Sequence, residues 1–200
     1  MQKLVEAIHG GYVHNRRVRV LSDHFAKLIP ANSRVLDVGC GDGFLSKLIQ
    51  NKRPDISIEG IDVLVRDSTH VPVQFFDGYS LPFADNEFDV VLFVDVLHHT
   101  TDPNVLLQEA CRVSKNDVLI KDHTQDGLFA RSTIRFMDHV GNARHGVALP
   151  FNYWPERDWR GAFKRLGLSI SYWTQSLQLY PWWGNWLFGR SLHFIARLSK

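Results

Sequence analysis

What this 200-residue sequence has little of already excludes several kinds of protein. Two cysteines, Cys40 and Cys111, are too few for a disulfide framework and are typical of a reducing compartment. The sequence contains no run of 18 apolar residues, so it predicts no membrane-spanning helix. Its first 20 residues lack the apolar core of a secretion signal, and we therefore expect a cytoplasmic protein.

The sequence also lacks an excess of charge of one sign. Its 23 Lys and Arg stand against 21 Asp and Glu, so overall charge gives no reason to bind nucleic acid. Charged residues make up 22% and hydrophobic residues 44%, as in globular proteins. Because domains commonly have about 150 residues, the length predicts one domain over residues 1–200.

The order of the predicted elements is typical of an α/β fold with a doubly wound parallel sheet. Apolar residues at helical spacing predict two helices over residues 3–29, joined at Gly10 and Gly11. Short apolar runs then predict strands, and helical stretches separate most of them. The strands are expected at 35–38, 56–62, 73–77, 88–96, 118–121, 168–174 and 192–198, and the helices at 44–50, 104–113 and 155–166.

The strongest motif is VLDVGCGDG at residues 35–43, at the first turn from strand to helix, where a doubly wound sheet binds its ligand. Its three glycines let the backbone turn sharply and approach a ligand closely. Phe44 occupies the place of the third glycine of the dinucleotide fingerprint. Carboxylates at Asp37 and Asp42 would repel a pyrophosphate and attract an ammonium or sulfonium, by about 4 kcal/mol for charges about 4 Å apart. The loop therefore favours S-adenosylmethionine over a nicotinamide dinucleotide, and a glycine turn without a ligand stays a third interpretation.

Two further strand ends carry acids that suit a nucleoside. Asp62 ends the second strand and could accept hydrogen bonds from both ribose hydroxyls. Asp77 and Gly78 end the third, where a carboxylate and an amide could meet the adenine edge. Each feature alone is also an ordinary turn or helix cap. Together with the glycine loop, the three strand ends predict a nucleoside pocket.

The chain resembles the class I S-adenosylmethionine-dependent methyltransferases, in particular the group called methyltransferase type 11. The resemblance covers residues 34–121, in the motifs VLDVGCGDG, EGIDV, FFDGYSLPFADNEFDVVLFVDVLHHTTDP and LLQEACRVSKNDVLIKDH. It implies a Rossmann-like sheet of seven strands, mostly parallel, with the last strand antiparallel. It also implies a helical cover at residues 1–30, a cofactor-binding core at 31–123 and a substrate-side region at 124–200. The segment LVRDST after the second strand predicts only a short helix.

The resemblance also assigns parts of the cofactor site. The glycine loop would pack against the methionine part, Asp62 would bind ribose, and Asp77 with Gly78 would meet adenine. The segment from Asp95 to His99 would line the methyl-transfer cavity. The expected cofactor-binding residues are Asp37, Gly39, Cys40, Gly41, Asp62, Val63, Asp77, Gly78 and Asp95.

Histidines follow the fourth and fifth predicted strands, on the ligand side of the sheet. His99 and His123 are the candidate catalytic bases for an acceptor that arrives protonated, because histidine titrates near neutral pH. Asp95 and Asp122 could orient such a histidine or bind the donor's ammonium. The alternative is that each histidine only hydrogen-bonds its loop or fills space. We expect no metal site.

The acceptor is less well defined. His98, Tyr12 and Trp154 are expected to line its pocket. Nucleic acid is not favoured, despite the basic stretch HNRRVR, because DVLHH replaces the Asn/Asp-Pro-Pro-aromatic motif and neither cysteine follows a proline. All six tryptophans lie between Trp154 and Trp186, partly in an insertion near residues 176–190. This insertion could fill the core or form a dimer contact, wall an apolar acceptor pocket, or rest on a membrane surface.

The sequence thus predicts transfer of a methyl group from S-adenosylmethionine to an oxygen or nitrogen of a small-molecule or lipid-like acceptor. A catalytically silent cofactor-binding protein and an NAD(P)-dependent reductase are the alternatives. The expected assembly is a monomer or homodimer.

Overall fold

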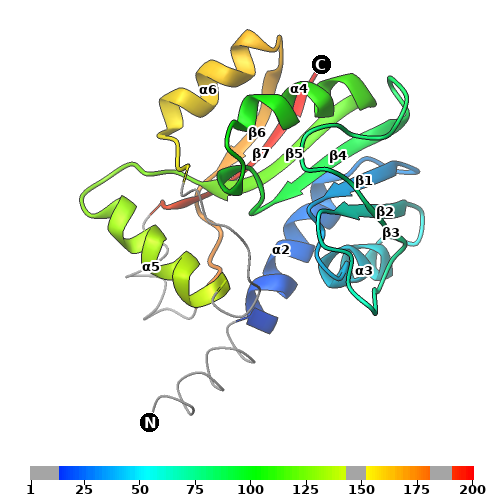
Figure 1. Cartoon of the computed structure of the whole chain (residues 1–200), viewed down its shortest axis with the longest axis horizontal. Helices are drawn as coiled ribbons and strands as arrows, with labels where there is room; N and C mark the ends of the chain where they lie inside the picture. Colours follow the sequence, from blue (N-terminus) through cyan, green and yellow to red (C-terminus); the bar gives the residue numbers. More distant parts are fainter. Residues whose placement is uncertain (1–13, 143–151, 181–190) are drawn as a thin grey trace.

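The computed structural model describes residues 14–142, 152–180 and 191–200. One seven-stranded sheet runs through these residues in the order β3-β2-β1-β4-β5-β7-β6 (Figure 1). β7 pairs antiparallel with both β5 and β6, while the other pairs are parallel, as the sequence predicted. The strands are β1 (Arg34–Val38), β2 (Ser57–Asp62), β3 (Val73–Phe75), β4 (Phe88–Val94), β5 (Ser114–His123), β6 (Ser169–Thr174) and β7 (His193–Ser199).

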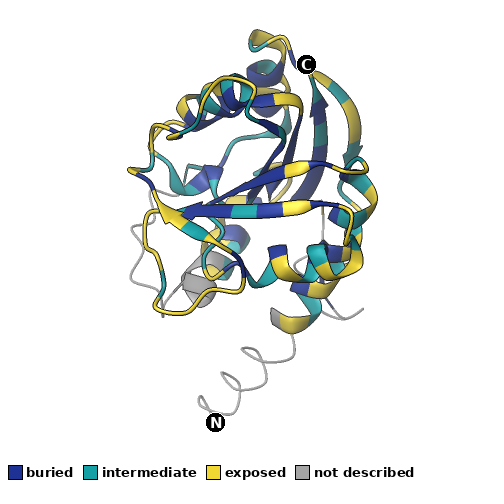
Figure 2. Cartoon of the chain, turned by 90° about the vertical axis from the view of Figure 1, so that its right-hand side faces the viewer, coloured by how far each residue is buried: buried dark blue, intermediate teal, exposed yellow. Residues whose placement is uncertain are grey.

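Helices cover both faces of the sheet, so its central strands are buried on both sides (Figure 2). In β4, Val91 and Phe93 pack toward α4 and α6, whereas Val90 and Leu92 pack toward α2 and α3. This alternation explains why the run FDVVLFV is nearly continuous in apolar residues. The helices are α2 (His14–Leu28), α3 (Phe44–Lys52), the 3-10 helix η2 (Leu97–His99), α4 (Pro103–Val113), α5 (Ala130–Asn142) and α6 (Glu156–Arg165).

The chain reverses its direction of travel across the sheet between β1 and β4. From β1 it proceeds outward to β2 and β3, and then returns to place β4 on the other side of β1. Such a reversal opens a crevice outside the carboxyl ends of the strands, which is where ligands bind to sheets of this kind. The glycine loop after β1 and the histidines after β4 and β5 both lie at this edge.

Several local predictions were wrong, and one was confirmed in part. The segment LVRDST forms no helix, because bends and turns occupy the connection from β2 to β3. β5 begins at Ser114, directly after α4, because its polar start pairs with β4 and β7. In the aromatic insertion, Leu177, Leu179 and Tyr180 are buried and pack on the core, as the core-filling interpretation predicted. Tyr12 and residues 181–190 lie outside the described residues.

Within the described ranges, no helix is both long enough and apolar enough to cross a membrane.

Candidate functional site

The glycine loop joins β1 to α3 with three glycines in the left-handed region. Their φ angles are 73° at Gly39, 62° at Gly41 and 74° at Gly43. The amide of Gly39 donates to the carbonyl of Ile61 at 2.8 Å, which fixes the loop to the end of β2. A Cβ at Gly39 would lie 2.6 Å from Val96, whereas a Cβ at Gly41 would meet nothing within 4 Å. The loop therefore leaves open space beside Gly41, where a ligand can approach the backbone.

Asp62 and Asp77, the acids at the ends of β2 and β3, are each held in place by backbone amides. Asp62 accepts hydrogen bonds from the amides of Gly41 and Leu64, both at 2.8 Å, so it is tied to the glycine loop. Asp77 accepts from the amides of Tyr79 and Ser80, and these bonds lower the pKa of its carboxyl. Each carboxylate has two oxygens with several lone pairs, so both keep acceptor capacity for hydroxyl and amino groups.

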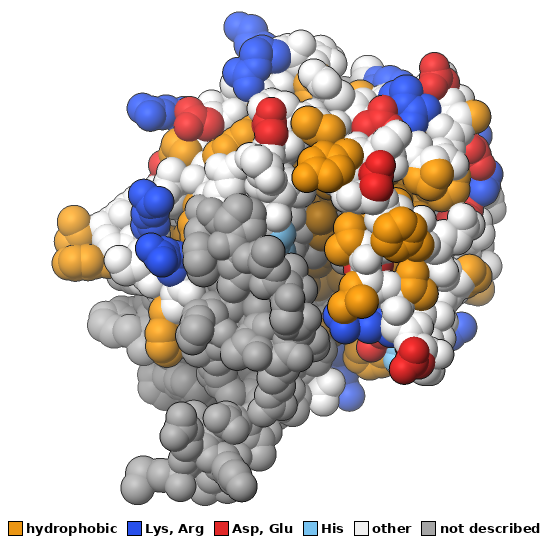
Figure 3. All heavy atoms as spheres, viewed as in Figure 1, with side chains coloured by type: hydrophobic (Ala, Val, Ile, Leu, Met, Phe, Trp, Pro, Cys, Tyr) orange, Lys and Arg blue, Asp and Glu red, His pale blue; other side chains and the backbone are white. Residues whose placement is uncertain are grey.

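Exposed apolar side chains surround these acids. Val63 follows β2 directly, and a Cβ at Gly78 would lie 3.3 Å from its side chain. Figure 3 shows a hollow in this face of the molecule, with histidine atoms inside it and apolar side chains on one side. Large apolar side chains at least 41% exposed here are Val63, Leu64, Val65, Phe75 and Tyr79. The combination of apolar surface and acids fits a purine base and a ribose, so these residues fit the expected cofactor.

Two residues expected to bind the cofactor are turned into the protein. Asp37 is 3% exposed, and it accepts a hydrogen bond of 2.5 Å from the hydroxyl of Ser46 in α3. Burial raises the pKa of this carboxyl to about 6. Cys40 is half-buried with its sulfur against Gly60, and burial raises the pKa of its thiol. Asp37 thus links β1 to α3, and contact of Asp37 or Cys40 with a cofactor stays a prediction.

The raised pKa of Asp37 predicts a pH-dependent stability. The folded chain binds this proton more tightly than the unfolded chain, whose aspartate titrates near 3.8. The stabilisation is therefore complete below pH 3.8 and is lost as the pH rises through about 6. Asp37→Asn cannot ionise, so its melting temperature should gain on the wild type between pH 4 and 7. Thermal melts across this range test it, with Asp67→Asn as an exposed control; a constant difference would contradict it.

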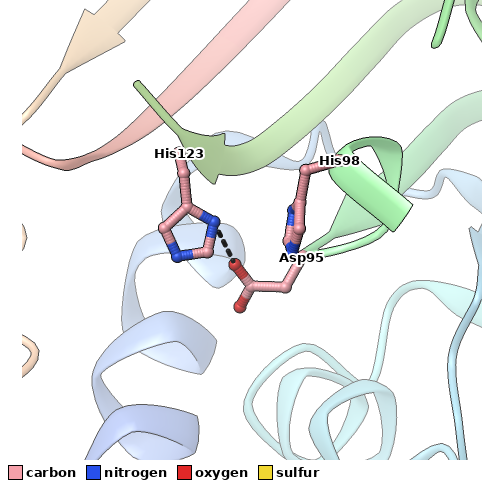
Figure 4. Close-up of side chains that lie close together, drawn as sticks. All are labelled: Asp95, His98 and His123. Atoms are coloured by element: carbon pink, nitrogen blue, oxygen red, sulfur yellow. Dashed lines mark ion pairs between the residues drawn. The ribbon is translucent and has the colours of Figure 1, made fainter. Parts of the chain in front are cut away.

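Histidines and acids cluster at the carboxyl ends of β4 and β5 (Figure 4). His98 Nδ1 lies 2.6 Å from Asp122 Oδ1, and both side chains are almost completely buried. Asp122 also accepts from the amides of Leu97 at 3.1 Å and His123 at 2.7 Å. Burial acts to raise the pKa of Asp122, but attraction to His98 and hydrogen bonds with the side chains of His123 and His98 outweigh it and lower the pKa. The ionised carboxylate therefore fixes the ring of His98.

The predicted histidines do come together. The ring of His98 lies 3.9 Å from that of His99 and 4.7 Å from that of His123. Tyr153 packs on the group, with its ring 5.6 Å from His98. Burial lowers the pKa of His123, so this imidazole is neutral near pH 7. His99 is the most exposed of the three histidines.

Asp95 is held by charged partners that the sequence analysis missed. Lys121 forms an ion pair with Asp95 Oδ1, and Arg17 of α2 pairs with Oδ2 at 3.0 Å. His123 Nδ1 lies 3.6 Å from the same carboxylate. Asp95 itself has a φ of 58°, unusual for a residue other than glycine. Two cations thus already pair with the carboxylate that was expected to bind the donor's ammonium or orient a histidine.

The missed network continues to β7. Lys121 is fully buried, and its ammonium lies 3.2 Å from Nδ1 of His193. Nε2 of His193 is 3.4 Å from the hydroxyl of Tyr180. Burial, followed by the charge of Lys121, lowers the pKa of His193 well below its usual value, so the neutral ring can accept a hydrogen bond from the lysine's ammonium. One signal was available, because a lysine inside the apolar run VLIKDH needs a buried partner.

Trp154 packs against the hydrophobic core next to α6. It is half-buried, and its ring centre is 4.9 Å from that of Trp159 in α6. Its carbonyl accepts a hydrogen bond from the amide of Gln125, in the loop after β5. Whether it touches an acceptor stays a prediction.

Comparison with known proteins adds a family and a fold. A family model described as a methyltransferase domain matches residues 12–172. The 27-O-demethylrifamycin SV methyltransferase of Amycolatopsis mediterranei is 27% identical over 129 residues, which are 54% of this chain and 47% of that protein. The tRNA (carboxymethyluridine(34)-5-O)-methyltransferase of Schizosaccharomyces pombe is 32% identical over 90 residues, or 43% and 38% of the two chains. The chain thus spans about half the length, or less, of these curated relatives.

A solved structure extends the likeness to the whole fold. The putative methyltransferase in complex with the Trm112 activator of Haloferax volcanii superposes with a TM-score of 0.69. The match covers 97% of this chain and 96% of that one, at 16% identity. At this identity the likeness establishes the fold alone.

Proposed function

Since this chain belongs to the family of S-adenosylmethionine-dependent class I methyltransferase domains, we propose that it transfers a methyl group to an oxygen of a small-molecule acceptor. An oxygen acceptor is favoured by the Asp122–His98 pair, which lies at the same edge of the sheet as the glycine loop. A hydroxyl must lose its proton during methylation, and an oriented neutral imidazole can accept it. The names of both relatives compared above also refer to methylation at an oxygen.

In this proposal the protein aligns and deprotonates the acceptor. The cofactor, when bound, supplies a methyl group already activated on a sulfonium. Gly39, Gly41, Asp62 and the pair Asp77–Gly78 would hold it, while Asp37 and Cys40 support the loop from behind. Holding the two reactants in line is worth about 7–11 kcal/mol in well-oriented reactions.

We propose that His98 is the base that accepts the proton of the acceptor's hydroxyl. Asp122 holds its Nδ1–H, which fixes the tautomer in which Nε2 is the basic nitrogen. The sequence predicted His99 and His123 as bases and His98 as a lining residue. Because Asp122 holds His98, we instead propose His98 as the base. His99 and His123 would then line the space beside the reacting hydroxyl.

The same cluster has the donor types of a metal site, so the two interpretations must be separated. Ligand atoms of Asp95, His98 and His123 all lie within 4.8 Å of one another. However, the ammonium of Lys121 already pairs with Asp95, and Arg17 pairs with its other oxygen. A divalent ion on that carboxylate would lie about 4 Å from the ammonium and be repelled by about 8 kcal/mol, twice the value for unit charges. Lys121 thus takes the place of a metal, and the histidines serve as bases.

Because Lys121 already pairs with Asp95, we expect that removal of metal ions by a chelator leaves turnover unchanged. Dialysis against EDTA, followed by an assay of methyl transfer, should give the same kcat as the untreated protein. A loss of activity that zinc or manganese restores would contradict the assignment and favour the metal.

The proposed function itself is tested by labelled donor. We expect radioactive methyl from S-adenosylmethionine to appear in an alkali-stable product when the protein meets a panel of phenols and alcohols, and the product to require His98. Donor binding by calorimetry without any labelled product would favour the silent cofactor-binding protein. Label in tRNA would place the acceptor among nucleic acids, as in the S. pombe relative.

A further inference from the structure

The proposed base can accept only a limited range of protons. The side chains of His98 and Asp122 are 1% and 0% exposed, with 2.6 Å between Nδ1 and Oδ1. The backbone amides of Leu97 and His123 also donate to Asp122. The pair therefore presents an imidazole in one fixed orientation, and the acidity of the acceptor decides whether this imidazole can take its proton.

The basicity of an imidazole limits the acceptor from both sides. Histidine titrates at about 6.5 and a phenol at about 10, so full proton transfer between them is unfavourable by about three to four powers of ten. An aliphatic hydroxyl is about as weakly acidic as water, at about 15.7, which makes the same transfer unfavourable by about nine powers of ten. A carboxylic acid titrates at about 4 and arrives ionised, so the pair would have no proton to accept. A phenol suits the pair best.

The cations next to the pair do not extend this range. A cation against the oxygen of an aliphatic hydroxyl would favour its ionised form. Among the described residues around the pair, Lys121 and Arg17 carry such charges, and each forms an ion pair with Asp95. Lys121 is also fully buried, with its ammonium 3.2 Å from Nδ1 of His193. The acidity therefore has to come from the acceptor itself, as it does in a phenol.

His98, His99 and His123 bring their rings together, and they are here called the histidine cluster. The ring centre of His99 lies 3.9 Å from that of His98, and His123 meets His98 edge-on at 4.7 Å. Tyr153 stacks on His98, with 5.6 Å between ring centres and 27° between planes. Figure 3 shows histidine atoms inside the hollow and apolar side chains beside it. An aromatic acceptor can make ring contacts of the same kinds, so the cluster fits a planar ring better than an alkyl chain.

We infer that the acceptor is a phenol whose ring lies against the histidine cluster; this rests on the proposed function and names its substrate class. The O–H proton of the phenol passes to Nε2 of His98. A lone pair of the phenol oxygen forms the bond to the methyl carbon, while the electrons of the carbon–sulfur bond stay on the sulfur and cancel its positive charge. The products are a methyl aryl ether, a neutral thioether and an imidazolium paired with Asp122, which then returns its proton to water.

Acceptors of matched ring size test the inference on the wild type alone. With labelled S-adenosylmethionine at about pH 8, we expect 4-methylphenol to be methylated with a kcat/KM about a hundredfold or more above that of benzyl alcohol. Benzoic acid should give no alkali-labile ester. Binding is measured without turnover, because the absorbance of 4-nitrophenol should change saturably when the protein is added together with S-adenosylhomocysteine.

A second arm removes the base. His98→Gln should lower kcat with 4-methylphenol about 10²- to 10³-fold, but change kcat with 4-nitrophenol, which is largely ionised at this pH, by about threefold or less. The remaining rate with 4-methylphenol should rise about tenfold per pH unit toward about pH 10, because phenolate then forms in solution. His24→Gln, at a half-buried position of α2 outside the cluster, is the matched control and should behave as the wild type does.

Three results would overturn the inference. No phenol could be methylated, benzyl alcohol or benzoic acid could react as fast as 4-methylphenol, or His98→Gln could lose the same factor with both phenols, which would give His98 only a structural role. Label in the alcohol or the acid alone would still reveal transfer to an oxygen, so the proposed function would survive. Absence of labelled product from every oxygen acceptor would overturn both.

Discussion

Changing Asp122 to asparagine is expected to lower kcat by about 10²- to 10⁴-fold, the usual contribution of an oriented general base. The physical reason is the tautomer of His98. An asparagine at this position can present an N–H to Nδ1, which would move the ring proton to Nε2 and leave that nitrogen unable to accept a proton. The affinity for S-adenosylmethionine should stay unchanged, because Asp122 lies near the end of β5, which β4 separates from β1 and its glycine loop.

Asp117 provides a matched control on the same strand. It is also buried, and it pairs with Arg197 at 2.8 Å and accepts from the hydroxyl of Ser199, toward the opposite end of β5. Asp117→Asn should reduce stability, since it weakens a buried ion pair, but leave kcat of the folded protein unaltered. Steady-state kinetics and calorimetry of both variants decide the matter. Equal losses of kcat in the two variants would mean that Asp122 has only a structural role.

The second large effect concerns Gly41. A methyl group added here would point into the open space beside the loop, where the ligand is expected to approach. We expect Gly41→Ala to weaken S-adenosylmethionine binding by about a hundredfold, because forcing an extra methyl into a fitted contact costs about 1–3 kcal/mol. The positive φ of 62° adds a stability loss of about 1–2 kcal/mol, independent of the ligand.

Gly167 separates these two contributions. Its φ is 72°, and a Cβ there would also meet nothing within 4 Å, but it lies between α6 and β6, away from the site. Gly167→Ala should therefore lose similar stability while binding the donor normally. Calorimetry and thermal melts measure both quantities. Normal donor affinity in Gly41→Ala would show that no ligand contacts the loop at this point.

Much of the fold was predictable because its signals are local. The glycines of the first loop, the acids at the ends of β2 and β3, and the cap of α4 each depend on a few adjacent residues. For α4, Asp102 accepts from the amide of Asn104 at 2.9 Å and Pro103 begins the helix, as such a cap requires. The predicted helix at LVRDST failed because its residues instead follow the turn that Asp62 starts by accepting from Leu64.

The site was predictable only in its parts. The sequence placed histidines after two strands, and neighbouring strand ends in a parallel sheet meet at one edge. It could not show that Asp122 would lie nearest to His98, 24 residues away, at 2.6 Å, with His123 Nδ1 farther off at 3.5 Å. It also could not show that Arg17 pairs with Asp95, because Arg17 is 78 residues away on a helix that packs against the sheet.

By itself, then, the sequence determined the α/β class, the glycine loop after β1 and the acids at the ends of β2 and β3, because short-range spacing and period-two burial specify them. The tertiary structure alone decided the charges within the cavity. Lys121 faces Asp95 and His193 because the register of β5 against β4 and β7 brings these strands together there, and a strand's own residues do not specify its register. The ion pair between the buried Lys121 and Asp95 is thus a consequence of strand pairing.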